Sequence, residues 1–209
     1  MSIVLYDYWR SSAAYRVRIA LNLKDIAYES RTVSLVDGEQ RGPEHLARNP
    51  QGLVPTLEAD GLVLTQSLAI IDWLDATCPK PRLVPADPTA RAQALARALV
   101  IVSDIHPIDN LRVLKRLEAQ FGADQAAKDD WYRHWVRDGL HALEAMAGDG
   151  PFLGGRAPDV SDVCLVPQLY NARRFDLPLD RYPRLCRADA AAAKLDAFAA
   201  AHPDRVKPV

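Results

Sequence analysis

Residues 49–73 read NPQGLVPTLEADGLVLTQSLAIIDW, and this stretch decides the fold. Two short apolar runs, residues 53–57 and 62–64, flank a polar Asp–Gly turn, and an apolar pattern of helical spacing follows them. We therefore predict a strand, a turn, a second strand and a helix. Pro55 lies inside the first run, and because proline cannot donate to a sheet ladder, it belongs at the start or edge of a strand. A cis Val54–Pro55 bond suits this position, since only bonds before proline adopt the cis form at low cost.

The segments before this stretch complete a small α/β domain. Apolar runs, alternation and helical spacing predict a strand over residues 3–7, a helix from about 12 to 24, a strand over residues 28–33 and a short helix over residues 43–48. We expect the first two strands to be parallel, because a helix connects them. The order β-α-β-α-β-β-α indicates a thioredoxin-like domain over residues 1–81.

Proline and composition mark a boundary after this domain. Residues 79–88 contain four prolines, and beyond them strand signals disappear while alanine, leucine and charged residues dominate. We expect an all-α domain over residues 88–209. Its predicted helices cover residues 89–121 with an interruption at His106–Pro107, residues 123–147, residues 160–173 and the alanine-rich C-terminal end. Asp159 and Asp162 have the spacing of a capping box at the start of the third of these helices.

Charge and hydropathy exclude several classes of protein. The 209 residues carry 26 Lys and Arg against 27 Asp and Glu, a formal net charge of −1. Nucleic-acid-binding proteins usually show a basic stripe, so we expect no nucleic-acid partner. No apolar run reaches the roughly 18 residues of a membrane span, and the N-terminal residues lack the pattern of a secretory signal. We therefore expect a cytoplasmic protein that does not associate with membranes.

The cysteines suggest neither a disulfide nor a metal site. Cys78, Cys164 and Cys186 are odd in number, far apart, and match no metal or redox spacing. We expect them to be small buried side chains with free thiols in a reducing compartment. No second histidine or carboxylate stands at metal-ligand spacing from His106, so we expect no metal.

Several motifs resemble those of one enzyme family. The runs VPTL (54–57) and QSLAIIDWL (66–74) resemble the glutathione site of the glutathione S-transferase superfamily. The run WRSSAAYRVRIALNLK (9–24) is similar to the active-site signature of its zeta class, which includes maleylacetoacetate isomerases. Residues 104–114 and 165–175 extend the similarity over nearly the whole chain. The resemblance implies the glutathione S-transferase architecture, glutathione as a recycled cofactor, a homodimer and a role in aromatic amino acid catabolism.

A serine pair stands where the first helix is predicted to begin. Ser11 and Ser12 are typical helix caps, and a helix N-terminus also favours negative charge and lowers the pKa of a thiol. The resemblance implies that Ser11, or secondarily Ser12, donates a hydrogen bond to the glutathione thiolate. No nearby histidine or aspartate would make Ser11 an acyl-transfer nucleophile. The class signature has cysteine where this chain has Ala13, so an activity that needs a protein thiol there is not expected.

A second group of residues is a candidate for binding the rest of glutathione. Gln66 and Ser67 open the helix after the second strand of residues 49–73, where backbone N–H groups and a hydroxyl favour a carboxylate. The resemblance implies that both residues hold the γ-glutamyl carboxylate. Val54, beside Pro55, would pair with the cysteinyl backbone like an added strand. Gln51 is a weaker candidate that also suits a polar loop.

Polar residues beside the predicted helix break are open to two interpretations. Ser103, His106 and Asn110 lie three and four residues apart, so we expect them to share one face of the helix. The resemblance suggests that His106 and Asn110 contact the ligand, whereas a lone helical histidine is more often a satisfied or surface residue. Both alternatives are compatible with the sequence.

Arginines are the candidates for binding a dicarboxylate substrate, because guanidinium groups grip carboxylates with two hydrogen bonds. Arg10 flanks the serine pair, and Arg174 ends a helix in a segment that resembles the class. Arg173 competes with Arg174 for this role. Arg112 ranks lower, because in a straight helix it would point away from Asn110. The chain's other two early arginines, Arg16 and Arg18, are assigned to structural ion pairs.

The resemblance implies a glutathione-dependent cis–trans isomerase that converts maleylacetoacetate to fumarylacetoacetate by reversible thiolate addition. Maleylpyruvate isomerisation is one alternative, for which relatives carry an arginine directly after the asparagine where this chain has Leu111. A non-catalytic glutathione-binding or regulatory module of the same fold is the other alternative, because fold alone does not decide function. Retention of Ser11, Gln66 and Ser67 argues against the second.

Overall fold

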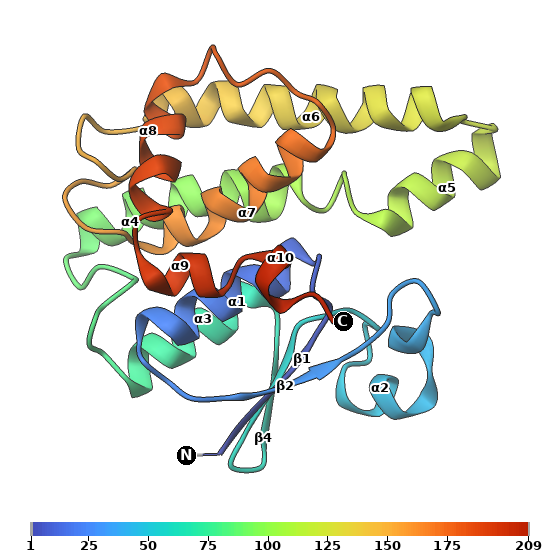
Figure 1. The fold of residues 1–209 in the computed structure, drawn as a ribbon, viewed down its shortest axis with the longest axis horizontal. Helices are drawn as coiled ribbons and strands as arrows, with labels where there is room; N and C mark the ends of the chain where they lie inside the picture. Colours follow the sequence, from blue (N-terminus) through green and yellow to red (C-terminus); the bar gives the residue numbers. More distant parts are fainter. Residues whose placement is uncertain (1, 209) are drawn as a thin grey trace. The chain divides into compact units, whose positions relative to one another are not determined.

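The computed structural model describes residues 2–208, which divide into two compact units (Figure 1). The N-terminal unit consists of residues up to Leu83 together with the segment from Ala193 onward, and the helical unit spans Val84–Ala192. The sequence boundaries of 1–81 and 88–209 assigned that last segment to the helical part. The structure instead packs it on the N-terminal unit, because α9 (Asp196–Ala200) lies against α1 (Ser12–Leu23).

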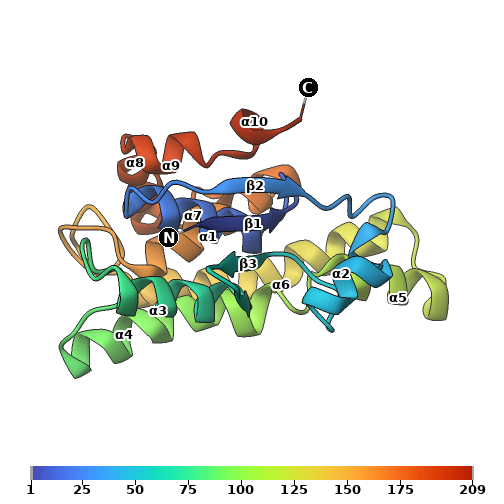
Figure 2. The same cartoon turned by 90° about the horizontal axis from the view of Figure 1, so that it is seen from below.

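A four-stranded mixed sheet forms the centre of the N-terminal unit (Figure 2). Its order is β2-β1-β3-β4, and the strands are β1 (Ile3–Asp7), β2 (Glu29–Thr32), β3 (Thr56–Ala59) and β4 (Leu62–Thr65). As predicted, β1 and β2 are parallel, whereas β3 is antiparallel to both β1 and β4. The register pairs Leu5 with Leu57, and both side chains are fully buried.

One strand boundary differs from the prediction. The strand expected over residues 53–57 begins at Thr56 and continues to Ala59. Pro55 lies just before it, since a residue without an N–H cannot donate to the ladder with β1. The Val54–Pro55 bond is cis, as predicted, and a second cis bond joins Lys80 to Pro81.

Helices α1 and α3 (Ser67–Thr77) pack side by side in this unit (Figure 1). Their apolar faces are fully buried, and these faces consist of Val17, Ala20 and Leu21 on α1 and Ile70, Ile71 and Leu74 on α3. The remaining short helices are η1 (Glu39–Arg41), α2 (Pro43–Arg48) and α10 (Pro203–Val206). Cys78, which was expected to be buried, follows α3 as its C-cap and is only partly buried.

The helical unit contains α4 (Pro88–Leu99), the π-helix η2 (Val100–Ile105), α5 (Leu111–Phe121), α6 (Gln125–Met146), α7 (Val160–Arg174) and α8 (Pro183–Ala192). In agreement with the sequence, its described residues contain no strand. Helix α7 is the most buried of these helices. The predicted capping box is present, since Asp159 accepts from the Ser161 amide and Asp162 accepts from the Asp159 amide at 3.0 Å.

The break in the first long helix is wider than the sequence indicated. The chain forms a π turn over η2, in which the His106 amide donates to the Ile101 carbonyl at 2.9 Å, and regular helix resumes only at Leu111. The prediction that Ser103, His106 and Asn110 share one helical face is therefore wrong. Proline at position 107 cannot donate to the helix, which explains the break but not its width.

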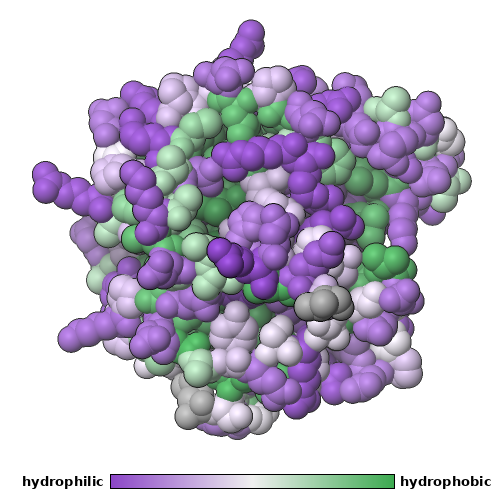
Figure 3. All heavy atoms as spheres, in the orientation of Figure 1, coloured by the Kyte–Doolittle hydropathy of each residue, from purple (hydrophilic) through white to green (hydrophobic). Residues whose placement is uncertain are grey.

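The surface is mostly hydrophilic on the face shown in Figure 3, and the cysteines are free thiols. Hydrophobic residues lie on this face in scattered patches between the hydrophilic ones. Within the described part of the chain, no helix is both long enough and apolar enough to span a bilayer. All three cysteines are free thiols, but only Cys164 is buried, so the expectation of burial is wrong for Cys78 and Cys186.

Candidate functional site

Ser11 is the N-cap of α1, one of the two serines that the sequence offered for this position. Its Oγ accepts from the Ala14 amide at 3.2 Å, and its own amide donates to the Tyr8 carbonyl at 2.8 Å. A hydroxyl that accepts one hydrogen bond still has its hydrogen to donate. Ser12 is buried inside the first turn, whereas Ser11 is only partly buried. Ser11 is therefore the better placed of the two to donate to an anion at this helix N-terminus.

Gln66 and Ser67 form the second helix start of the unit. Gln66 is the N-cap residue of α3 and has φ 67° and ψ 117°, a conformation that non-glycine residues rarely adopt. Such strain is found mainly where the surrounding structure holds a residue for function. Ser67 follows as the first helical residue and is 4% exposed. The backbone N–H groups of the first turn of α3 are oriented toward any carboxylate placed at this end.

Arg16 contacts the candidate residue Ser67, and sequence reasoning missed this contact. It was assigned to a structural ion pair, but its Nη1 donates to Ser67 Oγ at 3.3 Å in a buried contact. The two residues are 51 positions apart, so no local pattern could have indicated the bond. A guanidinium beside the N-terminus of α3 adds positive charge where a carboxylate is expected to bind.

The loop before β3 lies beside the same helix start. The Gln66 Nε2 donates to Gln51 Oε1 at 2.7 Å, which brings the weaker candidate Gln51 next to the stronger one. Asn49 Nδ2 donates to the Leu53 carbonyl at 2.8 Å and holds the loop closed ahead of Val54. Residues predicted separately around positions 51, 54 and 66 therefore meet in one part of the N-terminal unit.

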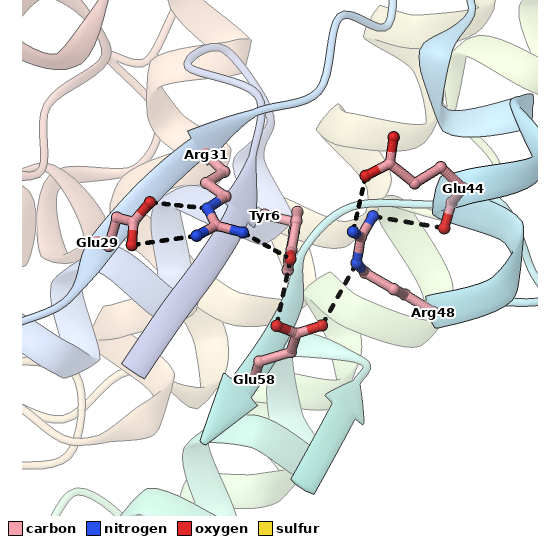
Figure 4. A network of polar contacts seen from close by, with 6 residues as sticks. All are labelled: Tyr6, Glu29, Arg31, Glu44, Arg48 and Glu58. Atoms are coloured by element: carbon pink, nitrogen blue, oxygen red, sulfur yellow. Dashed lines mark hydrogen bonds and ion pairs between the residues drawn. The ribbon is translucent and has the colours of Figure 1, made fainter. Parts of the chain in front are cut away.

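A polar network holds α2, which leads into this loop, against the sheet (Figure 4). Glu58 lies between two partners: the Tyr6 hydroxyl donates to it at 3.2 Å, and Arg48 Nε lies 3.3 Å from it. The Arg48 guanidinium also lies 4.3 Å from the centre of the Tyr6 ring. Contacts of this kind are weak individually at a surface, but together they orient α2 and the loop that follows it.

In the helical unit, the side chain of Asn110 has a structural role that the sequence did not suggest. Its Oδ1 accepts from the Arg112 amide at 3.1 Å and caps α5. His106 ends the π turn of η2 and is partly buried. The straight helix used to rank Arg112 below the other arginines does not exist, because the chain turns between Ile105 and Leu111.

The arginine candidates differ in their surroundings. Arg174 is exposed near the end of α7, where its Nη1 donates to Asn171 Oδ1 at 3.2 Å. Its competitor Arg173 forms an ion pair with Asp189 at 2.5 Å. Arg10 is exposed, and its guanidinium lies 5.2 Å from the centre of the Trp9 ring.

Asp109 is a buried carboxyl group that no sequence pattern indicated. It is 6% exposed, and its carboxyl oxygens have no hydrogen-bond partner among the described residues. Burial raises the pKa of Asp109 to about 8, because an ionised carboxylate is unstable away from water. Asp109 is therefore largely protonated near neutral pH, beside the cap of α5.

Comparison with known proteins agrees with this architecture. The family model described as glutathione S-transferase, N-terminal domain, matches residues 10–77. Maleylacetoacetate isomerase of Rhizobium meliloti (strain 1021) is 51% identical over 98% of both chains. The holo structure of maleylpyruvate isomerase, a bacterial zeta-class glutathione S-transferase, superposes with a TM-score of 0.95 at 43% identity and 98% coverage of both chains.

A third relative was solved with ligands. Maleylacetoacetate isomerase from Anaeromyxobacter dehalogenans 2CP-1, with bound dicarboxyethyl glutathione and citrate in its active site, has a TM-score of 0.88 at 44% identity. That comparison covers 99% of this chain and 93% of the other.

A thioredoxin-like sheet with a cis proline, a serine-capped first helix and a helical second unit define a glutathione S-transferase fold. The chain belongs to the zeta class of the glutathione S-transferases, the class that contains the maleylacetoacetate isomerases.

Proposed function

We propose that this protein is a glutathione-dependent cis–trans isomerase that converts maleylacetoacetate to fumarylacetoacetate. The observation that carries the proposal is that one unit contains two helix N-termini with suitable polar groups. The Ser11 hydroxyl lies at the first, and Gln66 and Ser67 lie at the second. The first suits a thiolate and the second suits a carboxylate, and glutathione has both groups. Relatives with the names maleylacetoacetate isomerase and maleylpyruvate isomerase support the choice of reaction.

Glutathione is the cofactor, and we assign its binding to the N-terminal unit. Gln66, Ser67 and the α3 N-terminus hold the γ-glutamyl carboxylate, while the backbone of Val54 pairs with the cysteinyl residue ahead of Pro55. Gln51 supports the binding of glutathione through its bond to Gln66. This assignment leaves the sulfur for Ser11 at the start of α1.

The reaction uses the thiolate as a reversible nucleophile. Sulfur forms a bond to one carbon of the cis double bond, and the π electrons move through the conjugated ketone to its oxygen as an enolate. The former double bond is now single and rotates. When the enolate electrons return, the carbon–sulfur bond breaks, the trans double bond forms and the thiolate is released. Glutathione is not consumed, so the balance of atoms and electrons needs no other reactant.

The protein's contributions are a stabilised thiolate and charge opposite the substrate's carboxylates. We assign the first to Ser11, with Ser12 as the secondary candidate, because a donor at a helix N-terminus favours the ionised sulfur. Arg10 and Arg174 are the candidates for the carboxylates, and Arg112 remains a third. His106 and Asn110 are kept as ligand-contact candidates of the helical unit, although Asn110 already caps α5.

Maleylpyruvate isomerisation is the second candidate function, since it needs the same chemistry on a shorter diacid. The structural similarity to a maleylpyruvate isomerase favours it, whereas Leu111 at the position after Asn110 favours the longer substrate. A side-by-side assay of maleylacetoacetate and maleylpyruvate, each with and without glutathione, separates the two. Faster turnover of maleylpyruvate would reverse the assignment. Binding of glutathione without turnover of either substrate would favour a non-catalytic module.

We also propose that the protein is a cytoplasmic homodimer. Free cysteines suit a reducing compartment, and the dimer is what the superfamily resemblance implies. Light scattering at micromolar concentration is expected to give twice the chain mass of 23.1 kDa, and a mass equal to one chain would contradict the dimer. Fractionation of cells into cytoplasmic and membrane portions tests the location.

A further inference from the structure

The C-terminal segment, residues 193–208, is attached along the helix that Ser11 caps. Asn22 Nδ2 on α1 donates to the Ala197 carbonyl at 3.0 Å. The His202 ring packs edge-to-face on Tyr15, with 6.1 Å between ring centres. Figure 1 shows α9 running beside α1. A segment distant in sequence therefore lies along the helix that carries the proposed thiolate site.

Arg18 connects three elements of the unit through one guanidinium group. It is 1% exposed, and its Nη1 donates to both carboxylate oxygens of Asp7 at 2.8 and 2.6 Å. Its Nη2 donates to the Trp9 carbonyl at 3.0 Å, and its Nε donates to the Ala201 carbonyl at 3.1 Å. The planar fork of arginine fixes these directions relative to one another. Arg18 thus joins the end of β1, the loop before α1 and the C-terminal segment.

The loop that Arg18 holds leads directly to Ser11. The turn is closed by the Ser11 amide, which donates to the Tyr8 carbonyl at 2.8 Å. The C-terminal segment contacts the same loop a second time, because Lys207 Nζ lies 5.3 Å from the centre of the Trp9 ring. A shift of the Trp9 backbone would therefore change where the Ser11 hydroxyl points.

We propose that Arg18 is a positioning residue for the thiolate, and that the C-terminal segment helps to hold Ser11 in place through Ala201 and Lys207. The inference rests on the proposed function and extends it to residues that do not touch glutathione. A hydrogen bond weakens steeply when its distance and angle depart from the optimum. A small displacement of the Ser11 hydroxyl would therefore weaken its bond to the thiolate, while the carboxylate site at Ser67 stays intact.

Arg18→Lys is the primary test, because lysine keeps a positive charge opposite Asp7. One ammonium group on a flexible stem cannot hold a carboxylate and two carbonyls in a fixed plane. The thiol pKa of bound glutathione is measured from thiolate absorbance in the ultraviolet, together with kcat and the glutathione Kd. We expect the thiol pKa to rise by about one unit and kcat to fall roughly 10-fold, with Kd within about 3-fold of wild type.

Lys207 provides a second variant at an exposed position, where failure to fold is not a concern. Lys207→Ala is expected to raise the thiol pKa and to lower kcat, each by less than Arg18→Lys does. Lys207→Arg keeps the cation beside Trp9 and is expected to leave both values at those of the wild type. Asn22→Ala is the matched control. It removes a contact between α1 and the C-terminal segment but leaves Arg18 and Trp9 untouched, so the thiol pKa is expected to stay at the wild-type value.

Two results would overturn the inference. One is an Arg18→Lys or Lys207→Ala protein with the wild-type thiol pKa and kcat. The other is an Asn22→Ala protein whose thiol pKa rises as much as that of Arg18→Lys, which would mean that general loosening of the unit causes the effect. Failure of the proposed function is a different result: the wild-type protein would bind no glutathione, or would bind it without lowering the thiol pKa.

Discussion

Replacing Ser67 by alanine tests the placement of the glutathione carboxylate. Ser67 is the first residue of α3, is 4% exposed, and accepts from Arg16 Nη1 at 3.3 Å. Because the hydroxyl accepts that bond, its hydrogen is directed to a different acceptor. The substitution removes this donor, together with the acceptor of the Arg16 bond, and leaves the backbone N–H groups of the helix start in place.

The structure allows the size of the effect to be bounded. The lost interaction is one hydrogen bond to a charged group in a largely buried position, which contributes about 1.5–3 kcal/mol. Since each 1.4 kcal/mol is a factor of ten, the Kd for glutathione should rise by about 10- to 150-fold. A rise near 10-fold is expected if the backbone amides of α3 still bind the carboxylate strongly without the Ser67 hydroxyl.

Isothermal titration calorimetry measures the Kd directly, and thermal unfolding checks that the variant is folded. Thr77→Ala is the matched control, because it removes a hydroxyl from the other end of α3, where Thr77 donates to the Trp73 carbonyl at 2.8 Å. Its Kd should equal that of the wild type. A folded Ser67→Ala protein with an unchanged glutathione Kd would show that the carboxylate does not bind at Ser67.

Ser11, Arg174 and Asp109 each have an assigned property that a substitution tests. Ser11→Ala should lower kcat by about 10²- to 10³-fold, because a preorganised donor to the thiolate is lost, while the glutathione Kd changes little. Steady-state kinetics measure kcat and calorimetry measures Kd. An unchanged kcat would contradict the role of Ser11 as a donor to the thiolate. Arg174→Ala should raise the substrate KM about 10-fold or more through loss of a carboxylate partner, whereas Arg173→Ala should not; equal effects would remove the distinction between them. Burial raises the pKa of Asp109 from 3.8 to about 8, so the folded protein binds this proton over a range where the unfolded chain has released it. Its contribution to stability is fully present below pH 3.8 and is lost as the pH rises through about 8. Relative to Asp109→Asn, the wild type should therefore lose up to about 1.4 kcal/mol of its free energy of unfolding per pH unit across that range. Urea titrations at several pH values measure this difference. If the free energy of unfolding depended on pH in the same way in both proteins, the raised pKa would be contradicted.

Features that depend on neighbouring residues were readable from the sequence. Ser11 caps α1 through an amide three positions away, and the capping box at Asp159 and Asp162 spans the same interval. The strand order around the Asp–Gly turn also follows from a short stretch, since adjacent strands joined by two residues must pair antiparallel. The starts of α1 and α7 and the cis Val54–Pro55 bond were accordingly predicted in the right places, whereas β3 begins later than expected and the start of α5 was not predicted.

The break after α4 shows where local signals become insufficient. Pro107 predicts an interruption, but the chain leaves regular helical geometry already at Val100 and forms the π turn of η2. Ile105 of η2 packs closely on α6, where a Cβ at Gly139 would lie 2.3 Å from its side chain. The space that Ile105 occupies is provided by a glycine far along the chain, which no helical periodicity of residues 89–121 could reveal.

The sequence by itself determined most of the helices and strands and the polar side chains at the N-termini of α1 and α3. Caps, turns and apolar periodicity depend on residues only a few positions apart. Only the tertiary structure decided how these starts are supported. The bond from Arg16 to Ser67 spans 51 positions and that from Arg18 to the Ala201 carbonyl spans 183. Side-chain partners at such separations are selected by how helices pack on the sheet, and packing is a property of the folded chain as a whole.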